Sequence, residues 1–239
     1  MIINPYIFGG GGPVLSFVSG LHMDGSDGST TFTDQAGKTW TAFGDAQIDT
    51  AESKFGGASG LFDGTGDYIT TPDNSDFELG PSDFTIEGWF RAAGYPNNDA
   101  GSYTSSMISK DKAGDRGFYF YLDGTSSSFT GIGFVAFSDN STFGIAVSSS
   151  TIALNTWYHV AVCRNGSDLR IFLDGVTQYT SGVWSTTVQD TTGPLTMGAQ
   201  NYDATYKGEY NGHLDDWRLT RSALYTGDFT PPASAFPNT

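Results

Sequence analysis

Two adjacent carboxylates near the end of the chain are the residues with the clearest potential for chemistry. The apolar residues Leu214, Trp217 and Leu219 are spaced three and then two apart. Strict strand alternation therefore fails, and a β-bulge is predicted at Asp215-Asp216. A bulge can turn both carboxylates toward one region, where a cation would offset their repulsion. The alternative is that neighbouring arginine side chains or backbone NH groups pair with them.

Two tyrosine-rich segments have the composition of a sugar-binding surface. Residues 94–103 and 200–211 mix tyrosines with amides and carboxylates and lack strand alternation, so both are predicted to be rim loops. Sugar C–H faces stack on aromatic rings, while sugar hydroxyls need planar polar partners. Exposed tyrosines also serve protein contacts, and simple loop packing is a third interpretation. The tyrosines concerned are Tyr95, Tyr103, Tyr202, Tyr206 and Tyr210.

Catalytic residues do not form any familiar pattern. A glycosidase needs paired carboxylates about 5–10 Å apart, and the four glutamates lie in unrelated segments. Cys163, the single cysteine, lies about 13 Å from His159 along an extended strand at ~3.3 Å per residue, too far for activation. P-loop, zinc and dinucleotide motifs are absent from the sequence. We therefore expect no enzymatic activity.

The elements that must position these residues are β-strands. Residues 157–164 and 169–174 alternate with a period of two, and Asn165-Gly166 between them predicts a hairpin. Similar short runs, separated by Asp-Gly, Asn-Gly and Gly-Gly turns, recur up to Thr220. They predict an all-β, two-sheet antiparallel sandwich. Within the predicted strand 84–91, Glu87 is expected to be solvated or paired across strands.

Composition and net charge limit the classes of binding partner that we expect. The 239 residues include 32 glycines and nine prolines, and the net charge is −15. Such a negative surface repels nucleic-acid phosphates, so nucleic acid is not an expected partner. Aspartates in turns attract Ca²⁺, although Asp is also simply a good turn residue. Membrane insertion is not expected, because no apolar run approaches the ~18 residues of a span.

Several ordered motifs carry a family resemblance. These are FDGTGDYI (62–69), DFTIEGWFR (83–91), WYHVAVCRNGSDLRIFLDG (157–175) and HLDDWRLTRSALYTGDFTPP (213–232). Together they resemble the laminin-G-like, concanavalin A-like jelly roll over nearly the whole chain. The opening LHMDGSDGSTTFTDQAG (21–37) and AESKFGGASGLFDG (51–64) is similar to the version common in bacteriophage structural and tail genes.

The resemblance implies a single domain of two opposed antiparallel sheets with contact loops at the rim. Members often bind glycans or proteins, and many hold a structural Ca²⁺. The family position of the metal adds Asp24, in the early acidic loop, to Asp215 and Asp216 as expected Ca²⁺ ligands.

The N-terminal segment is predicted to be an attachment arm. Residues 1–13 contain an apolar run that includes Pro5, Tyr6, Ile7 and Phe8, followed by four consecutive glycines that would act as a linker. A frayed end or an added edge strand are the alternatives. The segment lacks the positive region of a secretory signal, and the jelly roll is expected to occupy residues 14–239.

These features together predict a non-enzymatic surface protein of a bacteriophage virion, assembled in the host cytoplasm. Its expected partners are other virion proteins of the capsid or tail, host-surface glycans and further copies of itself. One alternative is a receptor-binding, carbohydrate-binding tail module. A glycan hydrolase is the other alternative.

Overall fold

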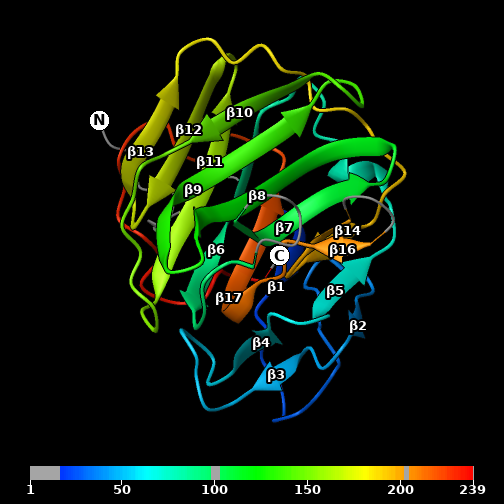
Figure 1. The fold of residues 1–239 in the computed structure, drawn as a ribbon, viewed down its shortest axis with the longest axis vertical. Coiled ribbons are helices and arrows are strands. Elements are labelled where there is room, and N and C mark those ends of the chain that lie inside the picture. Colours follow the sequence, from blue (N-terminus) through cyan, green and yellow to red (C-terminus); the bar gives the residue numbers. More distant parts are fainter. Residues whose placement is uncertain (1–16, 98–102, 202–204, 239) are drawn as a thin grey trace.

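The fold is a sandwich of two antiparallel β-sheets (Figure 1). The computed structural model describes residues 17–97, 103–201 and 205–238. In these residues the only helical element is a short 3₁₀ turn, η1 (Ser75–Phe77). None of the described helical structure is long or apolar enough to span a membrane. The prediction of an all-β, two-sheet jelly roll is confirmed.

One sheet has eight strands. Its order is β13-β12-β11-β6-β17-β4-β3, and β1 also pairs with β17. The bounds are β1 Phe17–Leu21, β3 Gln47–Asp49, β4 Ser59–Asp63, β6 Phe84–Ala92, β11 Tyr158–Asn165, β12 Asp168–Leu173, β13 Val176–Ser181 and β17 Asn211–Thr220.

The other sheet has seven strands in the order β10-β9-β8-β7-β14-β5-β2. Strands β10 and β2 are therefore its two outer edges. Strands β15 and β16 form a third, two-stranded sheet. The bounds are β2 Thr41–Phe43, β5 Tyr68–Thr71, β7 Thr104–Lys112, β8 Asp115–Thr125, β9 Ser128–Phe137, β10 Phe143–Val147, β14 Leu195–Met197, β15 Gln200–Asn201 and β16 Tyr206–Lys207.

The predicted hairpin between residues 164 and 169 is present. Strands β11 and β12 pair with Asn165 opposite Asp168, and Gly166 in the turn has φ +60°. A glycine adopts this left-handed conformation without the steric cost that a side chain would add. The Asn-Gly signal therefore predicted this turn correctly.

The core lies between the sheets and is rich in aromatic side chains. Phe84, Phe90, Phe120 and Trp217 are buried in it. Gly88 allows the Trp217 ring to lie against β6, because a Cβ there would fall 2.4 Å from the ring. The inner faces of both sheets are thus fully used for packing, and any contact surface must lie on an outer face or an edge.

Candidate functional site

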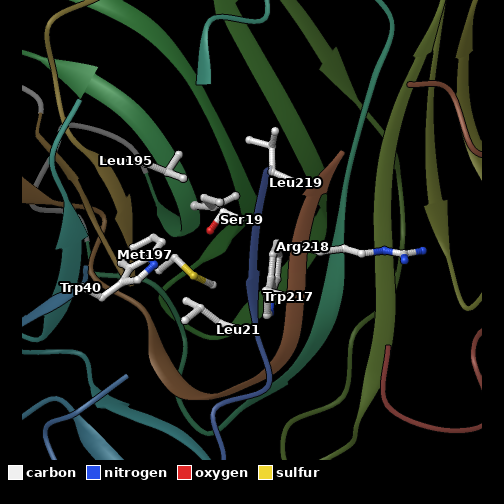
Figure 2. Close-up of a pocket in the computed structure, with 9 residues that line it drawn as sticks. Ser19, Leu21, Trp40, Leu195, Met197, Trp217, Arg218 and Leu219 are labelled. Atoms are coloured by element: carbon white, nitrogen blue, oxygen red, sulfur yellow. The ribbon is translucent and has the colours of Figure 1, made fainter. Parts of the chain in front are cut away.

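The cavity found between the two sheets is too small for a ligand. One cavity lies between the sheets, where Leu21, Trp40, Met197 and Trp217 converge (Figure 2). Its volume is about 10 Å³, which is no more than the space of a single water molecule. Arg218 belongs to the same stretch of β17, but its side chain points away from the cavity (Figure 2).

A row of three stacked rings lies at the β2 edge of the seven-stranded sheet. Phe43 of β2 stacks on Tyr68 of β5 at 4.7 Å, and Tyr68 stacks on Tyr206 of β16 at 3.7 Å between ring centroids. We call these three residues the aromatic column. Phe43 is 40% exposed, and Tyr206 is partly exposed. The column is an accessible aromatic surface built from three separate chain segments.

Strand register positions the first two rings of the column. Phe43 lies directly opposite Tyr68 in the antiparallel β2–β5 pair. Ile69, the next residue along β5, is fully buried in the core, so alternation places Tyr68 on the outer face. Cross-strand neighbours in such a pair are close enough for their rings to stack.

A buried carboxylate holds the ends of these two strands together. Asp67 accepts a hydrogen bond from the Asp45 NH at 2.6 Å and another from the Asp63 NH at 2.9 Å. Burial of Asp67 raises its pKa, against the effect of these hydrogen bonds. Gly44 lies against the Asp67 carboxylate, where a Cβ would be only 2.3 Å away. The turns beside Phe43 and Tyr68 are therefore fixed before any ligand arrives.

Polar groups surround the column. Thr41 and Thr70 are opposite each other in the β2–β5 pair, and Asp45 is exposed beside Phe43. Glu209 accepts a hydrogen bond from the Gly66 NH at 2.8 Å and so ties the segment after β16 to the turn before β5. Burial and the neighbouring Tyr206 raise the pKa of Tyr68, so its phenol stays neutral. Apolar ring faces beside hydroxyls and a carboxylate suit a polyhydroxylated ligand.

The predicted contact tyrosines differ in location and exposure. Tyr206 is part of the column. Tyr95 is 36% exposed and packs on Phe129, and Tyr103 is half-buried just before β7. Tyr202 lies outside the described residues.

Tyr210 is a correction to the predicted contact surface. Its side chain is fully buried, and its hydroxyl donates to the His213 carbonyl at 3.2 Å. Burial raises its pKa well above the usual value. The residue packs against Phe62 in the core instead of facing solvent. The polar composition of the segment around Tyr210 concealed this inward turn.

The predicted bulge on β17 is confirmed. The register with β6 shifts between Asp215 and Arg218, and Asp216 has φ +51°. Asp215 Oδ2 accepts hydrogen bonds from the Lys54 NH at 2.7 Å and the Phe55 NH at 3.0 Å. Backbone NH groups thus satisfy part of the acidic pair, as the alternative interpretation held.

The second carboxylate of the bulge points to other partners. Asp216 Oδ1 lies 2.6 Å from His22 Nδ1, and Asp216 Oδ2 accepts a hydrogen bond from the Phe236 NH at 2.7 Å. The hydrogen bond to Asp216 is the main cause that raises the pKa of His22 to about 9. Both oxygens of Asp216 are therefore engaged by the protein itself.

Two observations bear on whether the predicted acidic residues fit a cation. Asp215 Oδ1 is buried and has no hydrogen-bond partner among the described residues. Asp24 Oδ1 lies so close to Gly56 that a Cβ on this glycine would be 1.8 Å from the oxygen. Gly56 directly follows Lys54 and Phe55, whose NH groups bind Asp215. Asp24 and Asp215 carry the hard oxygen donors that a Ca²⁺ site uses. Within the described ranges, however, no three His, Cys, Asp or Glu side chains are grouped as metal ligands.

A set of ionisable side chains also converges on the outer face of the eight-stranded sheet. Glu87 lies opposite Arg218 in the β6–β17 register, and its Oε1 accepts from Arg218 Nε at 2.8 Å. Its Oε2 accepts from the Tyr225 hydroxyl at 2.7 Å, and His159 Nε2 is 3.2 Å away. Glu87 is therefore paired across strands, as one prediction held, and is not solvated.

The segment after β17 covers this cluster completely. Tyr225 stacks on Phe229 at 3.5 Å, and the Arg218 guanidinium lies 4.0 Å from the centre of the Phe236 ring. Glu87 and His159 are both 0% exposed. We call Glu87, His159, Arg218 and Tyr225 the sealed cluster. All four side chains of the sealed cluster are buried and are in contact with one another or with the covering aromatic rings.

The sequence and the fold both match known proteins. Residues 63–228 match the family model described as the concanavalin A-like lectin/glucanases superfamily. The chain belongs to this superfamily. No curated protein matches the chain by sequence.

Solved structures of this superfamily fold resemble the chain at low sequence identity. The binding domain of Paraclostridial Mosquitocidal Protein 1 has a TM-score of 0.67 at 16% identity, with 87% of this chain covered and 49% of that one. The botulinum neurotoxin serotype G binding domain gives 0.64 at 14%, with 88% and 49% covered. This chain therefore spans about half the length of these toxin domains.

Another similar structure matches over nearly its full length. Domain 4 of AbnA, an extracellular arabinanase of Geobacillus stearothermophilus in complex with arabinotriose, gives a TM-score of 0.63 at 16% identity, with 87% of this chain and 94% of that chain covered.

Sequence reasoning missed Phe43 and Tyr68, the other two members of the column. Phe43 is the last residue of β2, and Tyr68 is the first residue of β5. What the local pattern lacked was the pairing of β2 with β5 and the position of β16 over them. An aromatic residue on the outer face of an edge strand, next to a glycine-rich turn, was the signal that could have found them.

The predicted attachment arm belongs to the N-terminal segment that precedes the described residues. Pro5, Tyr6, Ile7 and Phe8 lie outside the described residues, as does the rest of the segment 1–13.

Proposed function

We propose that this chain is a non-enzymatic carbohydrate-binding module and that the aromatic column is its sugar-contacting surface. The observation that carries the proposal is the accessible row of Phe43, Tyr68 and Tyr206, held rigidly beside threonines and a carboxylate. Tyr68 is stacked between the other two rings, so the outer faces of Phe43 and Tyr206 provide the apolar contact. The polar neighbours provide orientation. The similar arabinanase domain in complex with arabinotriose supports a saccharide ligand.

The sealed cluster supports the non-enzymatic part of the proposal. A glycosidase needs two carboxyl groups that flank the scissile bond in an open cleft. Glu87 is a single acid, paired with Arg218 and covered by aromatic side chains. Release of reducing sugar from polysaccharides should therefore stay at the level of a buffer blank.

Sugar titrations test the proposal. We expect the chain to bind at least one oligosaccharide on a glycan array, with arabinotriose as the first probe in calorimetry. Phe43→Ala and Tyr206→Ala should each raise Kd about tenfold, because truncating a stacking ring costs on the order of 1–2 kcal/mol. Tyr95→Ala is the matched control, since Tyr95 is exposed to a similar extent but lies outside the column.

Two results would overturn this assignment. One is a blank array together with a blank titration. The other is a loss of binding in Tyr95→Ala with normal binding in Phe43→Ala and Tyr206→Ala, which would move the sugar site to the other tyrosine segment.

We also propose that the module is carried by a bacteriophage virion, on the head or tail surface. The resemblance of residues 21–37 and 51–64 to phage structural proteins supports this carrier, with residues 1–13 as the attachment to other virion proteins. Immunogold labelling of phage particles tests it. Label on the particle surface is expected, and its absence from purified particles would refute the proposal.

We propose, in addition, a structural Ca²⁺ held by Asp24 and Asp215, completed by backbone carbonyls and water. The unpartnered Asp215 Oδ1 and the close approach of Asp24 to Gly56 support it. The ion would neutralise buried negative charge and tie β17 to the acidic loop. Ca²⁺ should raise Tm relative to EDTA in the wild type and in the control Asp139→Asn, and not in Asp215→Asn. An equal Tm with Ca²⁺ and with EDTA would reject it.

A further inference from the structure

Strand β10 leaves one edge of the seven-stranded sheet open. It is the last strand in the sheet order, and no described strand pairs with its outer side. The Ser138 NH donates to the Thr142 carbonyl, and the Ser148 NH donates to the Ile132 carbonyl. Because inward and outward groups alternate along an antiparallel strand, the NH and C=O groups of Phe143, Ile145 and Val147 point away from β9.

The same three residues also expose their side chains. Phe143 is 51% exposed, Ile145 is 50% and Val147 is 39%, while Ala146 between them is buried in the core. On the same outer face, the Phe143 ring packs against Phe137 of β9, with ring centroids 5.3 Å apart. The edge therefore offers a strip of apolar surface and a row of unpaired backbone groups together.

This edge lacks the features that normally keep sheet edges apart. Charged side chains, prolines and bulges usually block pairing with another strand. Residues 140–163 contain no Asp, Glu, Lys, Arg or Pro, although the chain as a whole carries a net charge of −15. The pairing of β10 with β9 is also regular over all five residues.

From these observations we infer that β10 is the contact between two copies of this chain. The two β10 strands pair antiparallel about a twofold axis through Ile145, with Phe143 opposite Val147 of the second copy. This register uses every outward NH and C=O of the three residues. Two copies with the same strong negative charge repel each other elsewhere, so an uncharged edge is where they can meet.

The geometry of the pair leaves the proposed sugar site free. Strand β2, which carries Phe43, is the opposite edge of the same sheet. Pairing at β10 therefore makes one continuous sheet that has an aromatic column at each far end. The inference stands on β10 alone and does not depend on what the column binds.

Sedimentation analysis of the full chain tests the contact. The chain mass is 25.5 kDa, and we expect the wild type to sediment at twice this mass. Ile145→Lys places two like charges face to face on the axis and should halve the mass. Phe43→Lys is the matched control, an exposed apolar residue on the opposite edge, and it should stay dimeric. A monomeric wild type, or a dimeric Ile145→Lys, would overturn the inference.

Cross-linking gives a second test that does not depend on how the lysine variant folds. The proposed axis places residue 145 opposite its own copy, within the ~4.4–6.8 Å Cα range of a disulfide. Ile145→Cys should form covalent dimers on oxidation, while the wild type should not, because its Cys163 is buried. Monomers from Ile145→Cys would refute the register.

Deletion of residues 1–12 decides between a second sheet edge and the N-terminal arm as the occupant of β10. We expect the truncated chain to remain dimeric. A monomer would mean that the arm forms the contact, and the inference would be wrong. Loss of sugar binding with dimerisation intact, or the reverse, shows which of the two proposals has failed.

Discussion

The sealed cluster and the aromatic column show two uses of the outer side of a sandwich. Both combine aromatic rings with polar groups. In the sealed cluster the segment after β17 places Tyr225 against Glu87 and Phe229 against His159, and Glu87 is 0% exposed. At the column no described segment covers Phe43, which remains 40% exposed. Cover by the C-terminal segment, rather than residue type, separates a stabilising cluster from a contact surface.

The difference has an energetic meaning. A charge that is buried and paired is costly to leave without its partner, so the sealed cluster should contribute mainly to stability. An exposed ring loses little when it is truncated in the free protein, so the column should contribute mainly to binding. Substitutions in the two regions should therefore have opposite effects on stability and binding.

The largest expected effect is on stability. Glu87→Ala leaves Arg218 buried without its carboxylate and should lower the free energy of unfolding by about 3–5 kcal/mol. The more exposed pair of Asp168 and Arg170 is the control, and Asp168→Ala should cost less than about 1 kcal/mol. Urea denaturation measures both. Equal costs in the two variants would contradict a sealed, structural role for Glu87.

The second-largest expected effect is a loss of stability at low pH, caused by protonation of Glu87 in the sealed cluster. The pKa of Glu87 is lowered from 4.5 to about 2, because the Arg218 charge and the bonds to His159 and Tyr225 outweigh the effect of burial. A lowered carboxylate pKa contributes stability above pH 4.5 that is lost as the pH falls toward 2. The slope is up to about 1.4 kcal/mol per pH unit. Glu87→Gln should flatten this part of the stability curve, whereas an unchanged slope would place the acid sensitivity elsewhere.

A smaller effect on stability is expected from a change in Tyr225, which covers Glu87. Tyr225→Phe keeps the stack on Phe229 and removes only the hydrogen bond to Glu87. A hydrogen bond to a charged group contributes about 1.5–3 kcal/mol, and unfolding experiments should show that loss. Sugar affinity should be unchanged, so a weakened titration would mean that the two regions are coupled.

The smallest expected stability effect belongs to the column. Phe43→Ala should change the free energy of unfolding by less than about 1 kcal/mol, as surface substitutions usually do, while it weakens sugar binding. Thermal unfolding beside calorimetric titration measures both quantities. A large loss of stability would show that the ring is a packing element and would remove the contrast with the sealed cluster.

Local patterns predicted much of the fold. Alternation and an Asn-Gly turn placed the β11–β12 hairpin, and the failure of alternation at Asp215-Asp216 placed the bulge on β17. These features depend on residues near one another in the chain, where backbone geometry limits the choices.

The candidate site depends on contacts that local patterns do not contain. Phe43, Tyr68 and Tyr206 meet only because β2 pairs with β5 and β16 folds over them. Tyr210 lies in the core against Phe62, and its NH donates to the Gly198 carbonyl, which belongs to a distant segment. Pairings between distant segments decide both outcomes, and the spacing of residues in one segment does not reveal them.

Amide chemical-shift mapping during a sugar titration tests the central claim most directly. With arabinotriose, or the best ligand from the glycan array, we expect the shifts to concentrate on β2, β5 and β16 and to leave β6 and β11 unchanged. Shifts that cluster around Glu87 and His159 instead would mean that the covered face opens to ligands, and this would contradict the account.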